Sequence, residues 1–289
     1  QNQRQMPSTE RRTQRTVSEA PPVSSSESER HHYYTEQLNS YLIKIQTSHM
    51  NIQTELKTLG ELIAASPDTN QASAKLKELL KTSKIFESAF FAYAPGAGIR
   101  GVTHFMLWYM KKRNVLAKIN PDYRKYNYLK KKWYLRPMRT GNLYYTDPYS
   151  DSTGENHTIS AVIPIYKEGK PIGVAGADIP LRRITHNLSA LRFGNKGFAF
   201  LLNGSGLLLA HPNTRYIGVK KVYQFLQPES LFNTGETDPQ IYALAQVMLV
   251  QRKKDKALIT DTHSGKKYIA YFGPIIGTDW AMCILIQMQ

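Results

Sequence analysis

Residues 133–178 read WYLRPMRTGNLYYTDPYSDSTGENHTISAVIPIYKEGKPIGVAGAD, and this stretch sets the expected architecture of the chain. An aromatic and basic cluster opens it, and a turn-rich segment, 146–155, follows. Two β-patterned runs, 158–166 and 171–178, flank a Lys-Glu-Gly-Lys turn, and the second ends on the lone acid Asp178. Aromatic walls, cations at one end and a carboxylate at the other are what a pocket for a small polar ligand needs. The stretch therefore predicts such a pocket.

The length and composition of the chain favour a folded protein with one large or two ordinary domains. It has 289 residues, of which 41% are hydrophobic and 11% aromatic, so a packed core is expected. The sequence contains no run of about 18 or more apolar residues and no signal peptide. We therefore expect a soluble protein or a soluble piece of a longer one, with the single cysteine, Cys283, as a buried core thiol.

The formal net charge of +16 is concentrated in residues 111–139, which hold eleven Lys or Arg against one acid, Asp122. Such a basic field attracts anions of any kind: nucleic acid, anionic lipid head groups or a carboxylate ligand. Aromatic residues interleave with the basic ones, a pattern that single-strand binders use. A solvated basic face with tyrosines covering the core is the commoner meaning, and no recognised nucleic-acid motif accompanies the pattern. Binding of nucleic acid or another anionic polymer through 111–139 is kept as the alternative function.

Residues 1–32 are polar, which predicts a disordered leader or linker. From 33 to 66, apolar residues recur at alternating steps of three and four, with His49 in the one gap. The stripe consists of Leu38, Leu42, Ile45, Ile52, Leu56, Leu59 and Ile63. This spacing predicts one long helix, the stalk helix. Two interpretations are compatible with it: a core helix of the same domain, or a stalk whose stripe pairs with a second copy of itself.

Strand-like runs gather in two groups, at 85–180 and 197–288, each beside helical segments. This distribution favours an α+β fold with two modules of strands and flanking helices over an alternating βαβ array. We expect the modules to occupy residues 67–191 and 192–289. In the second module, Asn203-Gly204-Ser205-Gly206 between two apolar runs is a strong hairpin signal.

The motifs of common enzyme classes and metal sites are absent from the sequence. Gly204-Ser205-Gly206 lacks the Gly-Lys-Ser/Thr ending of a nucleotide-binding loop and does not match a nucleophile elbow. No HExxH or CxxC motif occurs, and the eight histidines are scattered, with His31 and His32 in the polar leader. We therefore expect a protein that is not an enzyme and that needs no cofactor or metal.

Several short motifs, taken together, resemble the double Cache sensor domain. They are Trp133-Tyr134, Asp147-Pro148-Tyr149-Ser150-Asp151, Pro164-Ile165, Gly173-Val174-Ala175-Gly176-Ala177-Asp178-Ile179, Gly197-Phe198-Ala199-Phe200-Leu201-Leu202, Gly206 and Ala210-His211-Pro212. This family forms the extracytoplasmic ligand-binding region of bacterial transmembrane receptors such as chemoreceptors and sensor histidine kinases. The resemblance, which covers about residues 33 to 289, implies a stalk helix followed by membrane-distal and membrane-proximal PAS-like modules. It also implies a periplasmic or cell-surface location on an inner-membrane protein and a homodimer through the stalk helix.

The resemblance further implies a ligand site in the distal module. In the amino-acid-binding branch, a Trp and two Tyr line the site and an Asp holds the ammonium group. The matching positions here are Trp133, Tyr134, Tyr149 and Asp178. Lys131 occupies the position of the carboxylate-binding Arg. It offers a cation but lacks the planar guanidinium that grips a carboxylate with two hydrogen bonds. Arg136 or Arg139 would compensate for that difference. Amino acids, biogenic amines and other small ligands remain open, with an amine end expected at Asp178 because a carboxylate in an aromatic box attracts it.

Overall fold

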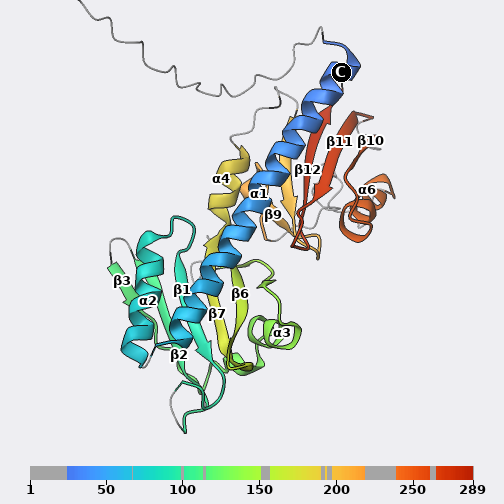
Figure 1. The fold of residues 1–289 in the computed structure, drawn as a ribbon. Coiled ribbons are helices and arrows are strands. Elements are labelled where there is room, and N and C mark those ends of the chain that lie inside the picture. The colour runs from blue at the N-terminus through green and yellow to red at the C-terminus, as the bar shows by residue number, and fades with distance from the viewer. Residues whose placement is uncertain are drawn as a thin grey trace, which may run out of the picture.

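The computed structural model consists of a long helix beside two β-sheet modules (Figure 1). It describes residues 25–66, 68–98, 101–112, 115–150, 157–189, 193, 197–218, 239–260 and 265–288. Of the leader predicted for residues 1–32, residues 1–24 lie outside the described ranges. The helices are α1 (Glu27–Ala64), α2 (Thr69–Thr82), η1 (Tyr128–Lys130), α3 (Lys132–Thr140), α4 (Leu181–Ser189), η2 (Thr214–Tyr216), α6 (Pro239–Ala245) and η4 (Gln246–Val250). In this described part of the chain, no helix combines the length and the apolar character of a membrane span.

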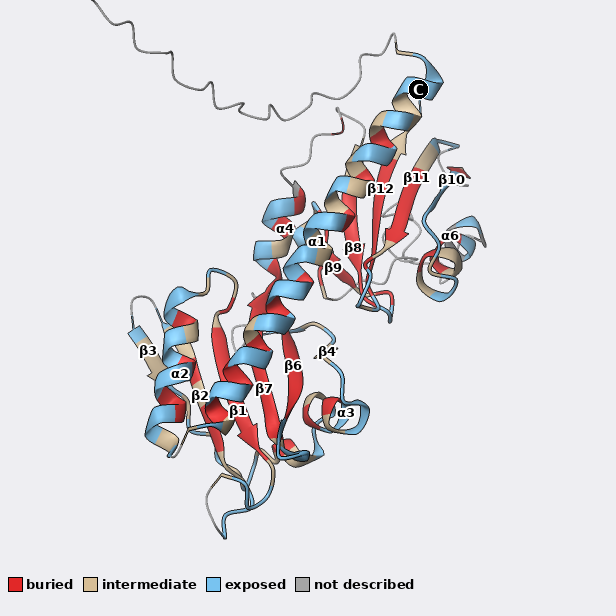
Figure 2. Cartoon of the chain, viewed as in Figure 1, coloured by how far each residue is buried: buried red, intermediate tan, exposed pale blue. Residues whose placement is uncertain are grey.

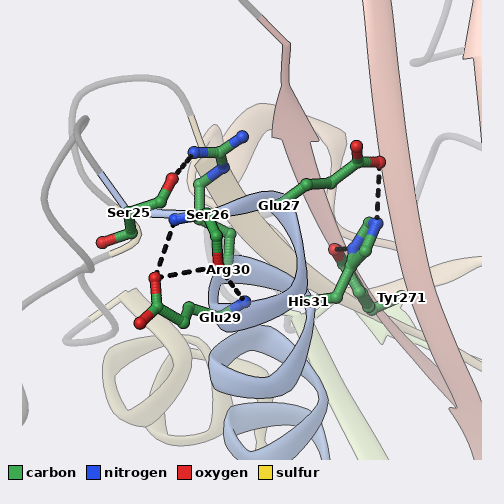
Figure 3. Close-up of polar contacts among 7 residues, drawn as sticks. All are labelled: Ser25, Ser26, Glu27, Glu29, Arg30, His31 and Tyr271. Carbon is green, nitrogen blue, oxygen red and sulfur yellow. Dashed lines mark hydrogen bonds and ion pairs between the residues drawn. The ribbon is translucent and has the colours of Figure 1, made fainter.

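Helix α1 begins ahead of residue 33, where the stalk helix was predicted to start, because a capping box defines its first turn. The Ser26 side chain accepts a hydrogen bond from the Glu29 amide (3.2 Å), and the Glu29 carboxylate accepts one from the Ser26 amide (2.7 Å). These bonds satisfy amides that lack a partner inside the helix. His31, assigned to the leader from the sequence, therefore lies on the helix. It hydrogen-bonds the Tyr271 hydroxyl and so ties α1 to the second module (Figure 3).

The apolar stripe of α1 packs against the protein's own two sheets (Figure 2). In the N-terminal half, Tyr34 packs on Tyr271 with ring centroids 5.5 Å apart. In the C-terminal half, a Cβ added at Gly60 would lie 2.0 Å from Ile165, so the helix approaches the first sheet closely there. The interpretation of α1 as a core helix is therefore correct. Pairing of the same stripe with a second copy is wrong, because the chain's own sheets already occupy it.

The first module is an antiparallel sheet in the order β3-β2-β1-β7-β6-β4, with β5 also paired to β6. Its strands are β1 (Ser88–Tyr93), β2 (Met106–Lys112), β3 (Val115–Lys118), β4 (Tyr144–Tyr145), β5 (Tyr149–Ser150), β6 (His157–Lys167) and β7 (Lys170–Pro180). Helices α1 and α2 cover one face of the sheet, and α3 lies on the other, against β6 and β7. The predicted turn joins β6 to β7, and Glu168 and Gly169 adopt the positive φ angles, 51° and 75°, that such a tight turn requires.

The second module is a smaller antiparallel sheet in the order β10-β11-β12-β8-β9. Its strands are β8 (Gly197–Leu202), β9 (Leu208–Ala210), β10 (Asp255–Thr260), β11 (Lys267–Pro274) and β12 (Ala281–Gln287). The hairpin predicted at 203–206 joins β8 to β9. A core separate from that under α1 contains Phe200, Met248 and the fully buried Cys283, whose pKa burial raises. The predicted fold class is confirmed: α+β, with a long N-terminal helix and two PAS-like modules of antiparallel strands flanked by helices.

Candidate functional site

The face of the first sheet opposite α1 and α2 carries a cluster of aromatic side chains, which we call the aromatic face. Strand residues alternate between the two faces, so Ala89 and Phe91 enter the core beneath α1 while Phe90 and Ala92 belong to the opposite side. The buried and half-buried members of this cluster are Phe90, Ala92, Met106, Trp108, Tyr123, Tyr126, Tyr128, Leu129, Trp133, Tyr134, Met138, Val162 and Val174. The aromatic face therefore combines side chains from four strands with those of α3 and the segment before it.

Three polar residues lie side by side at one edge of the aromatic face because of the strand register. Ser88 of β1 is paired with Asp178 of β7, and Asp178 is paired with Ser160 of β6. Directly opposite residues of antiparallel strands share a face, so the three side chains point the same way. The next residues on that face along the strands include Phe90 and Gly176, which form an adjoining apolar row. Asp178 thus lies between two hydroxyl groups and next to aromatic surface.

Asp178, the predicted amine-binding residue, is buried and accepts three hydrogen bonds from hydroxyl groups. Ser88 Oγ donates to Oδ2, and both Ser160 Oγ (2.7 Å) and Tyr149 Oη (3.0 Å) donate to Oδ1. Burial raises the pKa of Asp178, and the three hydrogen bonds oppose that shift by stabilising the charged form. A carboxylate offers about four acceptor sites, so one remains for a further donor. Because the three hydroxyls are neutral, they leave the charge of the carboxylate available to a cationic ligand.

Tyr149 lies on the short strand β5 and reaches over to Asp178. Its hydroxyl is 2.9 Å from Ser160 Oγ, while 41% of the residue's surface is exposed. The polar tip of the ring is therefore enclosed, and its outer side faces solvent. Burial of the hydroxyl raises the pKa of Tyr149, and the charge of Asp178 raises it further. The phenol consequently stays protonated at neutral pH and donates to the carboxylate.

The other two predicted aromatic residues differ in their surroundings. Trp133 is half-buried and meets the Phe90 ring edge to face, with centroids 5.1 Å apart. Tyr134 is buried and packs on Tyr128, with centroids 5.3 Å apart. Glycine at position 176 makes room for this cluster, because a Cβ there would lie 2.2 Å from the Phe90 ring. Trp133 thus lies in the outer part of the aromatic face, and Tyr134 lies beneath as packing support.

Four further residues belong to this arrangement although the sequence did not single them out as ligand-site residues. They are Ser88, Trp108, Tyr126 and Ser160. Trp108 Nε1 donates to Ser88 Oγ at 3.2 Å and so orients that hydroxyl. Burial raises the pKa of Tyr126, a hydrogen bond with Trp133 lowers it, and the charge of Asp178 raises it. Tyr126 was visible in the sequence only as part of the basic and aromatic segment, and the two serines had no local signal.

The three cations considered for the carboxylate end of a ligand have different surroundings. Lys131, at the N-cap of α3, is exposed, and its Nζ lies 5.5 Å from the centroid of the Tyr126 ring. The guanidinium carbon of Arg136 lies 5.0 Å from the centroid of the Tyr144 ring. Arg139 is exposed in the last turn of α3. Of these two ring contacts, that of Lys131 involves a member of the aromatic face, because Tyr126 belongs to it and Tyr144 does not.

A family model matches nearly the whole chain: the model of the dCache_1 family, described as a Cache domain, covers residues 23–289. The methyl-accepting chemotaxis protein PctB of Pseudomonas aeruginosa is 31% identical over 88 residues. These residues are 30% of this chain and 14% of PctB, so the chain spans a small part of the length of that relative.

Two solved structures resemble the whole described fold. One is the extracellular domain of mmHK1S-Z2, a protein named as a histidine kinase, with a TM-score of 0.75 and 20% identity over 89% of this chain and 97% of that one. The other is the ligand-binding domain of the Pseudomonas aeruginosa amino acid chemoreceptor PctC in complex with GABA. Its TM-score is 0.65, with 19% identity over 88% of this chain and 98% of that one. At these identities, the likeness shows a shared fold.

Proposed function

This chain belongs to the Cache domain family, and from that premise we propose that it is the extracytoplasmic, ligand-binding part of a transmembrane signalling receptor. Cache sensor domains of this family bind ligands and are not enzymes. The names of its relatives support a receptor of the chemotaxis or histidine kinase type, with the domain in the periplasm or at the cell surface. Within the described residues, no group of three or more His, Cys, Asp or Glu side chains is arranged to hold a metal ion.

The ligand we propose is a small molecule with a protonated amine, bound at the aromatic face of the first module. The observation that carries this proposal is the buried carboxylate of Asp178. It accepts hydrogen bonds from three neutral hydroxyl groups and has one acceptor site left for a ligand. An ammonium there gains charge attraction and cation–π contact together. Trp133, Tyr149 and Tyr126 are the rings proposed to contact it. Lys131, next to Tyr126, would attract an anionic end of the same ligand, which makes amino acids such as GABA the first candidates and biogenic amines the second.

The path of the chain supports the proposed tethering to a membrane. The start of α1 and the end of β12 lie at the same end of the molecule, where α1 contacts β11 and β12 (Figure 1). A membrane on that side would make the module at 67–191 the distal one and the module at 192–289 the proximal one. A homodimer through α1 would use the side that the buried stripe leaves free, where Ile43 is 63% and Met50 57% exposed.

Isothermal titration calorimetry against a library of amino acids and amines tests the proposed function. Saturable binding of at least one amine-bearing compound is the expected result. The alternative function, nucleic-acid or anionic-polymer binding through 111–139, predicts no saturable small ligand and an oligonucleotide affinity that falls steeply with salt. That second outcome would contradict the sensor proposal. The described basic residues of this segment do not form one continuous element: they lie on β2, β3, η1 and α3 and, as Arg124, Lys125 and Lys131, in the segments between these elements. Lys111 also donates to the Ser83 carbonyl at 2.6 Å.

Affinity for an amine ligand is expected to fall as the pH drops through the pKa of Asp178. Burial raises this pKa above its ordinary value, and the ionised carboxylate is the form that attracts an ammonium. Protons therefore compete with the ligand, and ligand binding releases a proton in that pH range. Titrations in two buffers of different ionisation enthalpy measure the release. Asp178→Asn is the control, since it removes the titrating group.

The stability of the ligand-free protein should depend on pH in the opposite direction to the ligand affinity. Because the folded state binds the Asp178 proton more tightly than the unfolded chain does, its contribution to stability falls as the pH rises from the ordinary aspartate range through the raised pKa. A ligand affinity that stays constant as the pH falls through the pKa of Asp178, measured by NMR in the ligand-free protein, would exclude Asp178 as the ammonium partner.

A further inference from the structure

Residues 144–150, which we call the strap, run along the edge of the first sheet beside the candidate site. Its two short strands, β4 and β5, both pair with β6. Between them, Thr146 makes two hydrogen bonds with Ser160: its amide donates to the Ser160 carbonyl (3.0 Å), and its hydroxyl accepts from the Ser160 amide (2.9 Å). Ser160 also donates to Asp178, so the strap is anchored directly beside the carboxylate.

Asp147, the next residue of the strap, binds the hairpin turn of the second module. Its Oδ1 accepts hydrogen bonds from Asn203 Nδ2 and Ser205 Oγ, both at 2.7 Å. Asn203 is buried, and its own side-chain oxygen accepts the amides of Ser205 (3.1 Å) and Leu207 (2.9 Å). These two bonds orient the Asn203 amide group so that its Nδ2 meets Asp147. The turn therefore presents two donors to a single acceptor.

Two further residues of the strap are held from outside the candidate site. Tyr145 packs on Trp280 of the second module, with ring centroids 4.6 Å apart, and its hydroxyl lies 3.1 Å from His49 Nδ1 on α1. Pro148 lies against Gly218, where an added Cβ would come within 3.1 Å of the Pro148 Cβ. The strap is thus held by the second module and by α1 as well as by the first sheet.

We propose that Asp147 is a positioning residue: it fixes the strap so that Tyr149 reaches Asp178. In this way it couples ligand binding to the docking of the hairpin turn at 203–206. The coupling rests on the proposed function, because the ligand is what Tyr149 and Asp178 would bind together. Asp147 and Tyr149 are two residues apart in a segment pinned to β6 on both sides, so a shift of one moves the other. Coupling of this kind is reciprocal: a ligand that fixes Tyr149 strengthens the docking of the turn, and loss of docking weakens the ligand.

The first test uses the ligand-free protein and compares Asp147→Ala with Asp147→Asn. Asn keeps an Oδ1 acceptor for both donors, whereas Ala removes it. In Asp147→Ala we expect amide hydrogen exchange to rise about tenfold in both the turn and the strap, as for loss of hydrogen bonds to a charged group. The Asp178 carboxyl, observed by carbon-13 NMR, should titrate at higher pH because it loses the Tyr149 donor. Asp147→Asn should match the unsubstituted protein in both measurements.

Asp255→Ala is the matched control, since it removes an exposed carboxylate on β10, at the opposite edge of the second sheet from the hairpin strand β9. It should change neither the exchange of the strap nor the titration of Asp178. A different outcome for Asp147→Ala would overturn the proposal: faster exchange in the turn alone, with the strap and the Asp178 titration unchanged. Asp147 would then merely cap the hairpin turn.

The second test measures the affinity for GABA by calorimetry in the same variants. We expect Asp147→Ala to weaken binding about tenfold, within the range typical of coupled sites, and Asp147→Asn to leave it unchanged. Equal affinity in Asp147→Ala and the unsubstituted protein overturns the coupling. If neither GABA nor any other amine binds the unsubstituted protein, the proposed function fails. The exchange and titration measurements then still decide whether Asp147 positions Tyr149.

Discussion

Asp178→Asn is expected to weaken amine binding by roughly 30-fold or more while the protein stays folded. Asn has nearly the same shape and still accepts hydrogen bonds through its Oδ1, but it has no charge to attract an ammonium. Removing one partner of a buried charge pair costs roughly 2–5 kcal/mol, which sets the size of the effect. Folding should tolerate the change, because burial already disfavours the charged form of Asp178. Calorimetry with the best ligand of the library, alongside thermal unfolding, measures both parts. Asp178→Ala should likewise abolish binding without unfolding the protein.

Glu87→Gln is the matched control for this experiment. It removes the same charge from the same module, next to Ser88, but the Glu87 carboxylate pairs with Arg182 at 2.7 Å. An effect of net charge alone would weaken the ligand equally in both variants. A direct contact predicts a large loss in Asp178→Asn and little change in Glu87→Gln. Undiminished affinity in Asp178→Asn would remove Asp178 from the site.

The sequence predicted best those elements that depend on residues close together in the chain. The turn at 167–170 and the hairpin at 203–206 both carry glycines that tight turns favour, and both join strands as expected. Strand β2 (Met106–Lys112) depends on a distant partner, because it pairs along its length with β1. The start of α1 was placed too late because its first turn lacks an apolar stripe. The capping box at Ser26 defines that start instead.

The candidate site could be predicted from the sequence only as far as the family motif reaches. The motif included Asp178 and Tyr149, and their hydrogen bond brings the two together. It did not distinguish Trp133, at the outer part of the aromatic face, from Tyr134, which is buried beneath. Ser88, 90 residues from Asp178, reaches the carboxylate only through strand register. Pairing of distant strands leaves no local pattern, so such partners become visible only in the folded structure.

Leu56→Ala is expected to lower the free energy of unfolding by roughly 2–5 kcal/mol, the usual cost of truncating a fully buried leucine. Leu56 has 0% exposed surface and lies in the core that α1 shares with both sheets. The substitution would leave a cavity between a helix and a sheet, whose backbones are too rigid to close it fully. Urea unfolding followed by circular dichroism measures the loss. Leu62→Ala is the matched control on the same helix, because it makes the same truncation at a leucine that is 44% exposed, and it should cost less than about 1 kcal/mol.

Protein concentration separates a core stripe from a dimer interface in the same experiment. If the stripe were shared between two copies, unfolding would accompany dissociation, and the measured stability would rise with protein concentration. A stripe buried within one chain gives a loss in Leu56→Ala that is the same at every concentration. Because α1 packs on both sheets, the cavity weakens a core that both modules share, and we expect a single unfolding transition shifted to lower urea. A concentration-dependent loss, or an equal loss in Leu62→Ala, would contradict the assignment of the stripe to the chain's own core.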